Sequence, residues 1–165
     1  MNEVKSDYIP SRKTMALLPY KTLGDASLVI EHNGQFIVPK SPIQLIKKSC
    51  LVNHSTYDGR RDAVVHQTGF KRKTPIPINP GRNLYSFPTH STTDPQCSWL
   101  FFHSIAKIKP ASGLPNPQLR SIITFYNGQQ IPMDISYHTL KKQMERTLAC
   151  IFVFSSDGKE ILETS

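Results

Sequence analysis

Two arginines, Arg60 and Arg61, stand side by side directly after an Asp-Gly dipeptide. Adjacent guanidinium groups repel each other, so the pair requires either nearby carboxylates or an anionic partner. Arginine suits a polyanion because its guanidinium group is planar, permanently charged and weakly hydrated. A second basic cluster, Lys71–Lys73, follows ten residues later. These residue types predict contacts with phosphate groups. The alternative is a pair of surface salt bridges from the arginines to Asp58 or Asp62.

The positive charge of the chain is concentrated in its second quarter. The 165 residues carry a formal net charge of +8. Residues 40–82 contain nine lysines and arginines but two aspartates, which gives +7, whereas residues 1–39 are neutral and residues 83–165 carry +1. A surface kept soluble by charge does not need such concentration, but a footprint for a polyanion does. Nucleic acid is therefore the predicted partner, and a plain basic surface is the alternative.

A tract rich in hydroxyl groups follows the basic segment. FPTHSTTDPQCSW, residues 87–99, holds five serines and threonines with one histidine and one glutamine. Small donors of this kind hold backbone phosphates, although an ordinary polar loop explains the tract equally well. We expect Phe87 and Trp99 to pack in the core. The candidate DNA-binding residues are Arg60, Arg61, Lys71, Arg72, Lys73, Lys47, Lys48, Thr89, Ser91 and Thr92.

Catalysis and metal binding find little support in the sequence. Cys50, Cys97 and Cys150 lie far apart and form no CxxC pair. Buried thiols in a reducing compartment are the favoured interpretation, and a zinc site or a Cys-His nucleophile pair is the weaker alternative. The chain has neither a GxGxxG motif nor a Walker lysine. We expect no enzyme activity, no cofactor and no metal.

The helices and strands that the sequence predicts around these residues indicate an α+β fold. We expect an antiparallel β-rich single domain with two Asn-Gly hairpins and two short amphipathic helices. Asn33-Gly34 and Asn127-Gly128 are the hairpin turns, because Asn-Gly favours two-residue loops. Ser41-Pro42 begins the first helix. Ser136 caps the second, whose apolar stripe is Tyr137, Leu140, Met144, Leu148 and Ile151.

The part of the basic segment that follows the first helix, from Ser55 to Arg82, is predicted to lack a helix. Arg60 and Arg61 are expected on an exposed turn. The stretch GFKRKTPIPINPGR, residues 69–82, contains three prolines and is typical of an extended segment or a sheet edge. LYSF and WLFFHSIAKI are predicted strands. The expected boundaries are a flexible N-terminal arm at 1–12, a DNA-binding domain at 13–154 and a short tail at 155–165.

Neither end of the chain nor its interior predicts a membrane or secretory segment. No run approaches the ~20 apolar residues of a spanning helix. MNEVKSDYIPSRK, residues 1–13, has no apolar region typical of a secretory signal. We therefore expect a cytoplasmic, nucleoid-associated protein.

Five segments are distinctive enough to compare with known families: SPIQLIKKSC, STYDGRR, PIPINP, LYSFPTHSTTDPQCSWLFFH and FYNGQQIPMDISYHTLKKQMERT. Together they resemble the competence transcription factor family, ComK, of Gram-positive bacteria, and the resemblance covers roughly residues 28–154. It implies an activator of DNA-uptake genes that binds paired A/T-rich boxes mainly through the minor groove, as an oligomer, and bends the DNA. The narrow, negative minor groove of A-tracts attracts arginine, so Arg60 and Arg61 are expected to enter it.

The resemblance also implies self-association and control by the adaptor MecA with the protease ClpC. The type member of the family extends beyond the end of this chain, and that extension carries the segment recognised by MecA. SSDGKEILETS, residues 155–165, does not resemble it. Two other functions remain open. One is a regulatory paralogue or protein-interaction module whose basic strip docks an acidic partner, and the other is an RNA binder.

Overall fold

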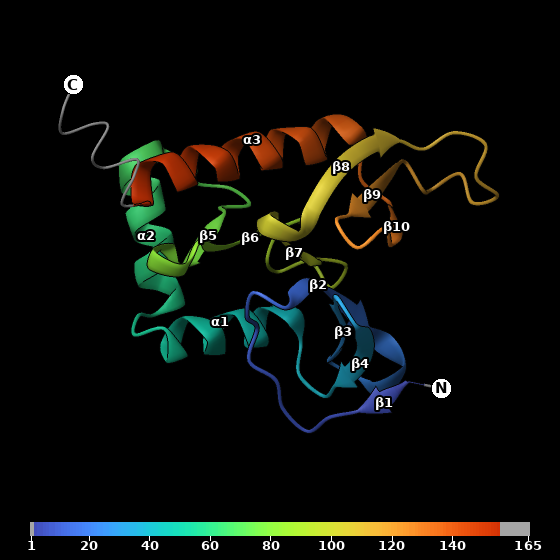
Figure 1. Cartoon of the computed structure of the whole chain (residues 1–165), viewed down its shortest axis with the longest axis horizontal. Coiled ribbons are helices and arrows are strands. Elements are labelled where there is room, and N and C mark those ends of the chain that lie inside the picture. Colours follow the sequence, from blue (N-terminus) through green and yellow to red (C-terminus); the bar gives the residue numbers. More distant parts are fainter. Residues whose placement is uncertain (1, 156–165) are drawn as a thin grey trace.

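The structure is a computed structural model and describes residues 2–155. Within this range the chain forms two β-sheets and three α-helices (Figure 1), which confirms the α+β class. The helices are α1 (Pro42–Val52), α2 (Tyr57–Thr68) and α3 (Tyr137–Phe154). The strands are β1 (Glu3–Val4), β2 (Thr14–Tyr20), β3 (Ala26–Glu31), β4 (Gly34–Val38), β5 (Ile76–Asn79), β6 (Leu84–Pro88), β7 (Trp99–Phe101), β8 (Ile105–Pro110), β9 (Ser121–Phe125) and β10 (Gln130–Met133).

The larger sheet has apolar side chains on both faces and forms the middle of the molecule. Its strand order is β1-β4-β3-β2-β7-β6-β5, and the smaller sheet runs β10-β9-β8. Trp99 and Phe101 of β7 pack on one face with Leu45 of α1. Leu100, between them, packs on the other face with Ile123 of β9. Successive side chains of a strand point to opposite faces of the sheet. Helix α1 therefore packs on one face of the large sheet, and the small sheet and α3 pack on the other.

Both predicted hairpins form, but their turns differ in detail from the prediction. Glu31 pairs with Gly34, so the first turn consists of His32 and Asn33 rather than Asn33-Gly34. The second loop is longer than two residues, since Thr124 pairs with Gln130. In it, Gly128 has φ 89° and donates its N–H to the carbonyl of Phe125, as in a three-residue loop with glycine in the left-handed region.

The first predicted helix is confirmed, and its start is defined by side chains. The Ser41 hydroxyl accepts the N–H of Gln44, while the Gln44 side chain accepts the N–H of Ser41. This reciprocal capping box satisfies two backbone donors at the helix start. Pro42 occupies the first helical position, where its missing N–H costs nothing.

The predicted turn at Arg60 and Arg61 is wrong, because both residues lie in α2. The Thr56 hydroxyl caps this helix by accepting the N–H of Gly59 at 2.9 Å. A Cβ at Gly59 would lie 2.9 Å from that same hydroxyl oxygen, so glycine serves the cap rather than a turn. The helix ends at Gly69, with φ 78°. Only Val64 in it is fully buried, so the sequence lacks the apolar stripe that reveals a helix.

Two further predictions need correction. The single strand expected for WLFFHSIAKI is divided by the short 3-10 helix Phe102–Ser104, where the chain leaves the large sheet and enters the small one. The second predicted helix is α3, but its stripe is displaced. Its buried residues are Leu140, Gln143, Thr147 and Cys150, whereas Leu148 is 57% exposed. Polar contacts, described below, bury Gln143 in place of an apolar residue.

The described part of the expected arm, residues 2–12, lies against the domain. Its strand β1 pairs in parallel with β4. The Tyr8 hydroxyl donates to Glu31 at 2.7 Å, and the carbonyl of Pro10 accepts the Ser49 hydroxyl. The expected tail at 155–165 lies, apart from Ser155, outside the described residues. None of the helices in the described range combines the length and the apolarity that crossing a membrane requires.

Candidate nucleic-acid interface

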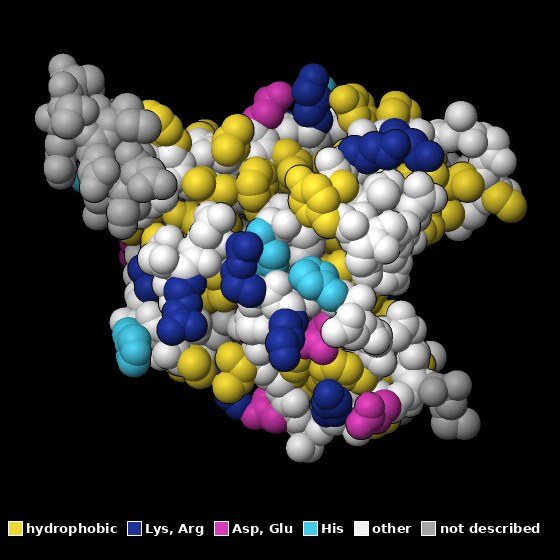
Figure 2. Space-filling view, viewed as in Figure 1, with side chains coloured by type: hydrophobic (Ala, Val, Ile, Leu, Met, Phe, Trp, Pro, Cys, Tyr) yellow, Lys and Arg dark blue, Asp and Glu magenta, His cyan; other side chains and the backbone are white. Residues whose placement is uncertain are grey.

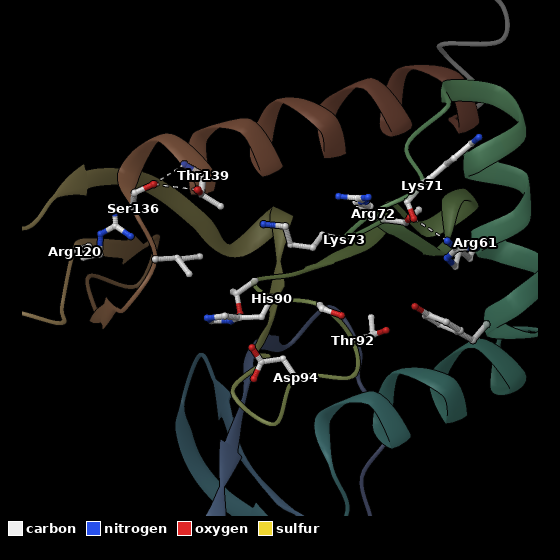
Figure 3. A pocket seen from close by; sticks show the side chains of 15 residues that line it. Arg61, Lys71, Arg72, Lys73, His90, Thr92, Asp94, Arg120, Ser136 and Thr139 are labelled. Atoms are coloured by element: carbon white, nitrogen blue, oxygen red, sulfur yellow. Dashed lines mark hydrogen bonds between the residues drawn. The ribbon is translucent and has the colours of Figure 1, made fainter.

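Seven of the ten candidate residues line a single cavity of about 550 Å³. The walls are the first turns of α2, the segment between α2 and β5, the loop after β6, the residue before β9 and the start of α3 (Figure 3). The candidates brought together there are Arg61, Lys71, Arg72, Lys73, Thr89, Ser91 and Thr92. We call this cavity the basic hollow.

The charge of the basic hollow is strongly positive. Arg120 joins Arg61 and the three cations of Lys71–Lys73, which makes five positive charges in the wall. Asp94 is the one carboxylate among the described lining residues. Figure 3 shows Arg72 and Lys73 extending toward the middle of the hollow, whereas Lys71 turns away from it. Like charges held this close repel each other, so an anion that neutralises them gains affinity.

Arg60 and Arg61 have different surroundings although they are neighbours in sequence. The Arg61 side chain donates to the carbonyl of Lys71 at 2.8 Å and so stays at the edge of the hollow. Arg60 instead donates to the carbonyl of Asn53 at 3.2 Å, and its Nε is buried without a partner in the described part of the chain. Successive residues of a helix point about 100° apart, which separates the two guanidinium groups. Arg60 is thereby directed between α2 and the end of α1.

The salt-bridge alternative for the two arginines is not observed. Among residues 2–155, neither Asp58 nor Asp62 forms an ion pair with Arg60 or Arg61. Within that range, the carbonyl contacts described above leave the charge of both arginines without a compensating carboxylate.

Lys47 and Lys48 of α1 lie outside the hollow. Lys48 forms an ion pair with Asp7, which also binds Lys40 at 2.8 Å. Hydrogen bonds from Lys40 and then Lys48 hold the pKa of Asp7 well below its usual range. Lys47 lies 5.8 Å from the ring centroid of Tyr57, a residue that lines the hollow. Lys47 therefore flanks the hollow, while the charge of Lys48 is shared with Asp7.

The hydroxyl tract contributes unequally. Thr89 is 1% exposed, and its hydroxyl accepts the N–H of Ser98 at 2.9 Å and contacts the ring of His90 at 2.7 Å. Its role in this structure is to fix the loop. Ser91 is exposed and Thr92 is half-buried at the rim. Those two hydroxyls are the ones positioned to meet a phosphate.

Sequence reasoning missed Arg120 as a member of the site, and it noted His90 in the hydroxyl tract without including it among the candidates. Arg120 lies 47 residues after Lys73 and has no basic neighbour in the sequence, so its position carries no sign of the cluster. It reaches the hollow because its N–H binds the carbonyl of Met133 beside β10. His90 lies 3.3 Å from Asp134, which also belongs to the β10 end. Tertiary packing, with Arg120 entering from the small sheet and His90 from the loop after β6, brings both residues to the hollow that Lys73 lines.

The expected structural roles of the aromatic and sulfur side chains are confirmed. Phe87 and Trp99 are 0% exposed. The three cysteines are free and buried, and burial raises the pKa of Cys50 to about 11 and that of Cys150 to about 12. Thiols with such pKa values hold their protons and make poor nucleophiles.

The face of the molecule drawn in Figure 2 carries exposed apolar side chains as well as cations. Figure 3 looks from behind the view of Figure 1, since α2 is on the left in one and on the right in the other. On the face shown in Figure 2, lysines and arginines are spread over the surface, and hydrophobic side chains gather along α3. Leu148 and Phe152 of α3 are 57% and 46% exposed. The face drawn in Figure 2 therefore carries both spread cations and the apolar side chains along α3.

Comparisons with known proteins agree with the resemblance noted in the sequence. The family model described as "ComK protein" matches residues 5–159. A curated protein of Bacillus subtilis (strain 168), named "Competence transcription factor", is 33% identical over 135 residues, which cover 81% of this chain and 68% of that protein. No solved structure gives a significant match. The chain belongs to the ComK family.

Proposed function

We propose that this protein is a transcription activator of competence genes that binds A/T-rich duplex DNA through the minor groove, with the basic hollow against the phosphate backbone. Family membership and the named relative support transcriptional control of competence. The observation that carries DNA binding is the gathering of five cations around one hollow whose described lining holds one carboxylate. Compartment and partners follow from this function: the protein acts in the cytoplasm, on the nucleoid, and without enzymatic activity.

The number of cations sets the expected salt dependence. Each phosphate neutralised on duplex DNA contributes about −0.9 to the slope of log K against log salt concentration. If all five cations of the hollow contact phosphates, the slope per protein is about −4.5. A protein-interaction module that docks an acidic partner would bind DNA only weakly and without preference for A/T boxes.

Base-pair substitution tests whether the protein reads the DNA sequence through the minor groove. In the minor groove, G·C differs from A·T by the 2-amino group of guanine. An inosine·cytosine pair lacks that group, so its minor groove resembles A·T while its major groove resembles G·C. We expect duplexes with A·T and I·C boxes to bind alike and G·C boxes to bind at least about tenfold more weakly, as measured by fluorescence anisotropy at fixed salt.

Two results would contradict the proposal. Weak binding to duplex DNA with no A/T preference at low salt favours the interaction module, and preferential binding of single-stranded RNA favours an RNA binder. If I·C boxes behave like G·C boxes, DNA binding stands but reading through the minor groove is wrong.

Self-association and proteolytic control are proposed from the family alone. The exposed Leu148 and Phe152 lie in the second half of α3 and do not line the basic hollow, so contact between copies there would leave the cations accessible. In the family, the segment recognised by MecA lies in an extension that residues 155–165 do not resemble, and residues 156–165 lie outside the described structure.

A further inference from the structure

The segment between α2 and β5 is a closed loop with its backbone tied inward. We call residues 70–74 the basic loop. The Thr74 hydroxyl donates to the carbonyl of Phe70 at 2.7 Å and closes it. Lys73 has φ 46°, a left-handed conformation that costs a residue with a side chain on the order of 1 kcal/mol. Such strain persists where the surroundings hold it, and here they do.

Side chains from two helices bind three carbonyl groups of the loop. Arg61 of α2 donates to Lys71 at 2.8 Å, and Arg146 of α3 donates to Arg72 at 2.7 Å. Gln143 of α3 donates to Lys73 at 2.9 Å. Since these carbonyls face the protein, the charged side chains are left on the outside. Lys71 and Arg72 are accordingly exposed.

A second hollow, of about 700 Å³, adjoins the first across this loop. Both share Lys71–Lys73 and Thr139 in their walls. The second hollow is completed by the first half of α3, with Lys142, His138 and Arg146, and its described lining contains no carboxylate. The basic loop therefore lies between the two hollows. On the side away from the loop, the first hollow is lined by Arg120, and the second is lined by Lys142.

The dimensions of DNA decide which element can enter the minor groove. An α-helix with its side chains is about 10–12 Å across, whereas the minor groove of B-DNA is about 6 Å wide. Helix α2 therefore cannot carry Arg60 and Arg61 into that groove together. A single arginine side chain on a narrow loop can enter it, and narrow A/T grooves attract arginine.

We propose, building on the proposed function, that the basic loop enters the minor groove through Arg72 and that the two hollows hold the two phosphate backbones that border the groove. Arg61 and Arg120 face one backbone, and Lys142 of α3 faces the other. Gln143 and Arg146 act as positioning residues, because they touch the loop and not the DNA. The first half of α3 thereby becomes part of the DNA interface, which neither the charge distribution nor the apolar stripe of the sequence predicted.

Three substitutions at exposed positions test the arrangement. Arg72→Ala should weaken binding to A·T boxes about tenfold and leave G·C affinity unchanged, which removes the preference. Arg72→Lys keeps the charge but is more strongly hydrated, so most of the preference should still be lost. Lys142→Ala should weaken both duplexes alike and reduce the salt slope by about one. Lys109→Ala, in β8 and outside both hollows, is the matched control and should change neither.

Specific outcomes overturn this inference. If Arg72→Ala weakens A·T and G·C duplexes equally, or Arg72→Lys retains the full preference, then Arg72 contacts a phosphate and the loop does not read the groove. If Lys142→Ala leaves affinity and salt slope unchanged, the second hollow is not part of the interface. In each case the affinity of the wild-type protein for duplexes with I·C boxes tests the proposed function independently of these variants. The variants should have the same midpoint of urea denaturation as the wild type, which shows that a change in DNA affinity does not come from unfolding.

Discussion

Gln143 offers the sharpest test of how the protein holds its basic loop. The side chain is 2% exposed. Its amide nitrogen donates to the carbonyls of Lys73 at 2.9 Å and Pro88 at 2.8 Å, and its oxygen accepts from Arg146 at 2.6 Å. Substitution Gln143→Glu keeps the shape and the contact with Arg146 but converts the donor of two hydrogen bonds into an acceptor. The variant therefore perturbs the chemistry without leaving a cavity.

The expected loss can be estimated from these contacts. Two hydrogen bonds contribute about 1 kcal/mol each, and a buried group left without a partner costs about 1–3 kcal/mol. The ion pair between the new carboxylate and Arg146 offsets part of this cost. We expect the free energy of unfolding to fall by about 3 kcal/mol at pH 7. The domain should stay folded, since typical stabilities are about 5–15 kcal/mol.

Urea denaturation at pH 7 measures this loss through the fluorescence of Trp99, the single tryptophan of the chain, which is fully buried. DNA affinity should fall with stability, because the carbonyl of Lys73 loses its closest donor. The deficit should shrink as the pH is lowered, since protonation of the introduced carboxyl group restores a donor for one of the two bonds. Gln67→Glu, at an exposed position of α2, is the matched control and should change stability by less than about 0.5 kcal/mol.

The reasoning is refuted if Gln143→Glu has the stability of the wild type and binds A·T boxes equally well. That result would mean that the carbonyls of Lys73 and Pro88 do not depend on the Gln143 amide. A loss of stability with full DNA affinity would separate the two roles, and would show that the loop does not need this contact to bind DNA.

Two further predictions concern residues away from the loop. Arg60→Ala should lower the free energy of unfolding by about 1 kcal/mol, through the lost bond to Asn53, and leave the A/T preference intact; urea titration and competition binding measure the two effects. Burial lowers the pKa of His103 to about 4, so the folded state resists a protonation that the unfolded state accepts below about 6.5. Stability present above pH 6.5 should therefore be lost as the pH falls toward 4. His103→Gln should show a smaller loss between pH 7 and pH 5 in urea titrations, and an equal loss in both proteins would contradict this.

The elements that were predicted well have local causes. Helix α1 begins at Ser41-Pro42 because the cap and the proline act on their own neighbours along the chain. The edge position of β5 follows from the prolines of its segment, which cannot donate hydrogen bonds on both sides. Helix α2 was missed because the Asp-Gly dipeptide in its first turn resembles a turn signal, and because the residues that pack on it, such as Tyr85 and Cys150 around Val64, are distant in sequence.

The candidate site was predicted in composition but not in arrangement. Charge counting identified the basic loop, since Lys71–Lys73 is a contiguous run whose side chains are bound to lie near one another. It could not separate Arg61 from Arg60, because the rotation of α2 decides which of them faces the hollow. It gave no sign that Lys48 pairs with Asp7, because the two residues lie 41 positions apart in the sequence.

The order of the amino acids was enough to indicate the ComK family, the concentration of positive charge in the second quarter, and the caps and hairpins that depend on neighbouring residues. Chain packing was needed to place Arg120, Lys73 and the start of α3 around one hollow, and to turn the carbonyls of the basic loop inward. The two groups of features differ in the range of their interactions. Caps and turns act over three or four residues, whereas the contacts of Gln143 and Arg146 with the loop join residues 70 and 74 positions apart.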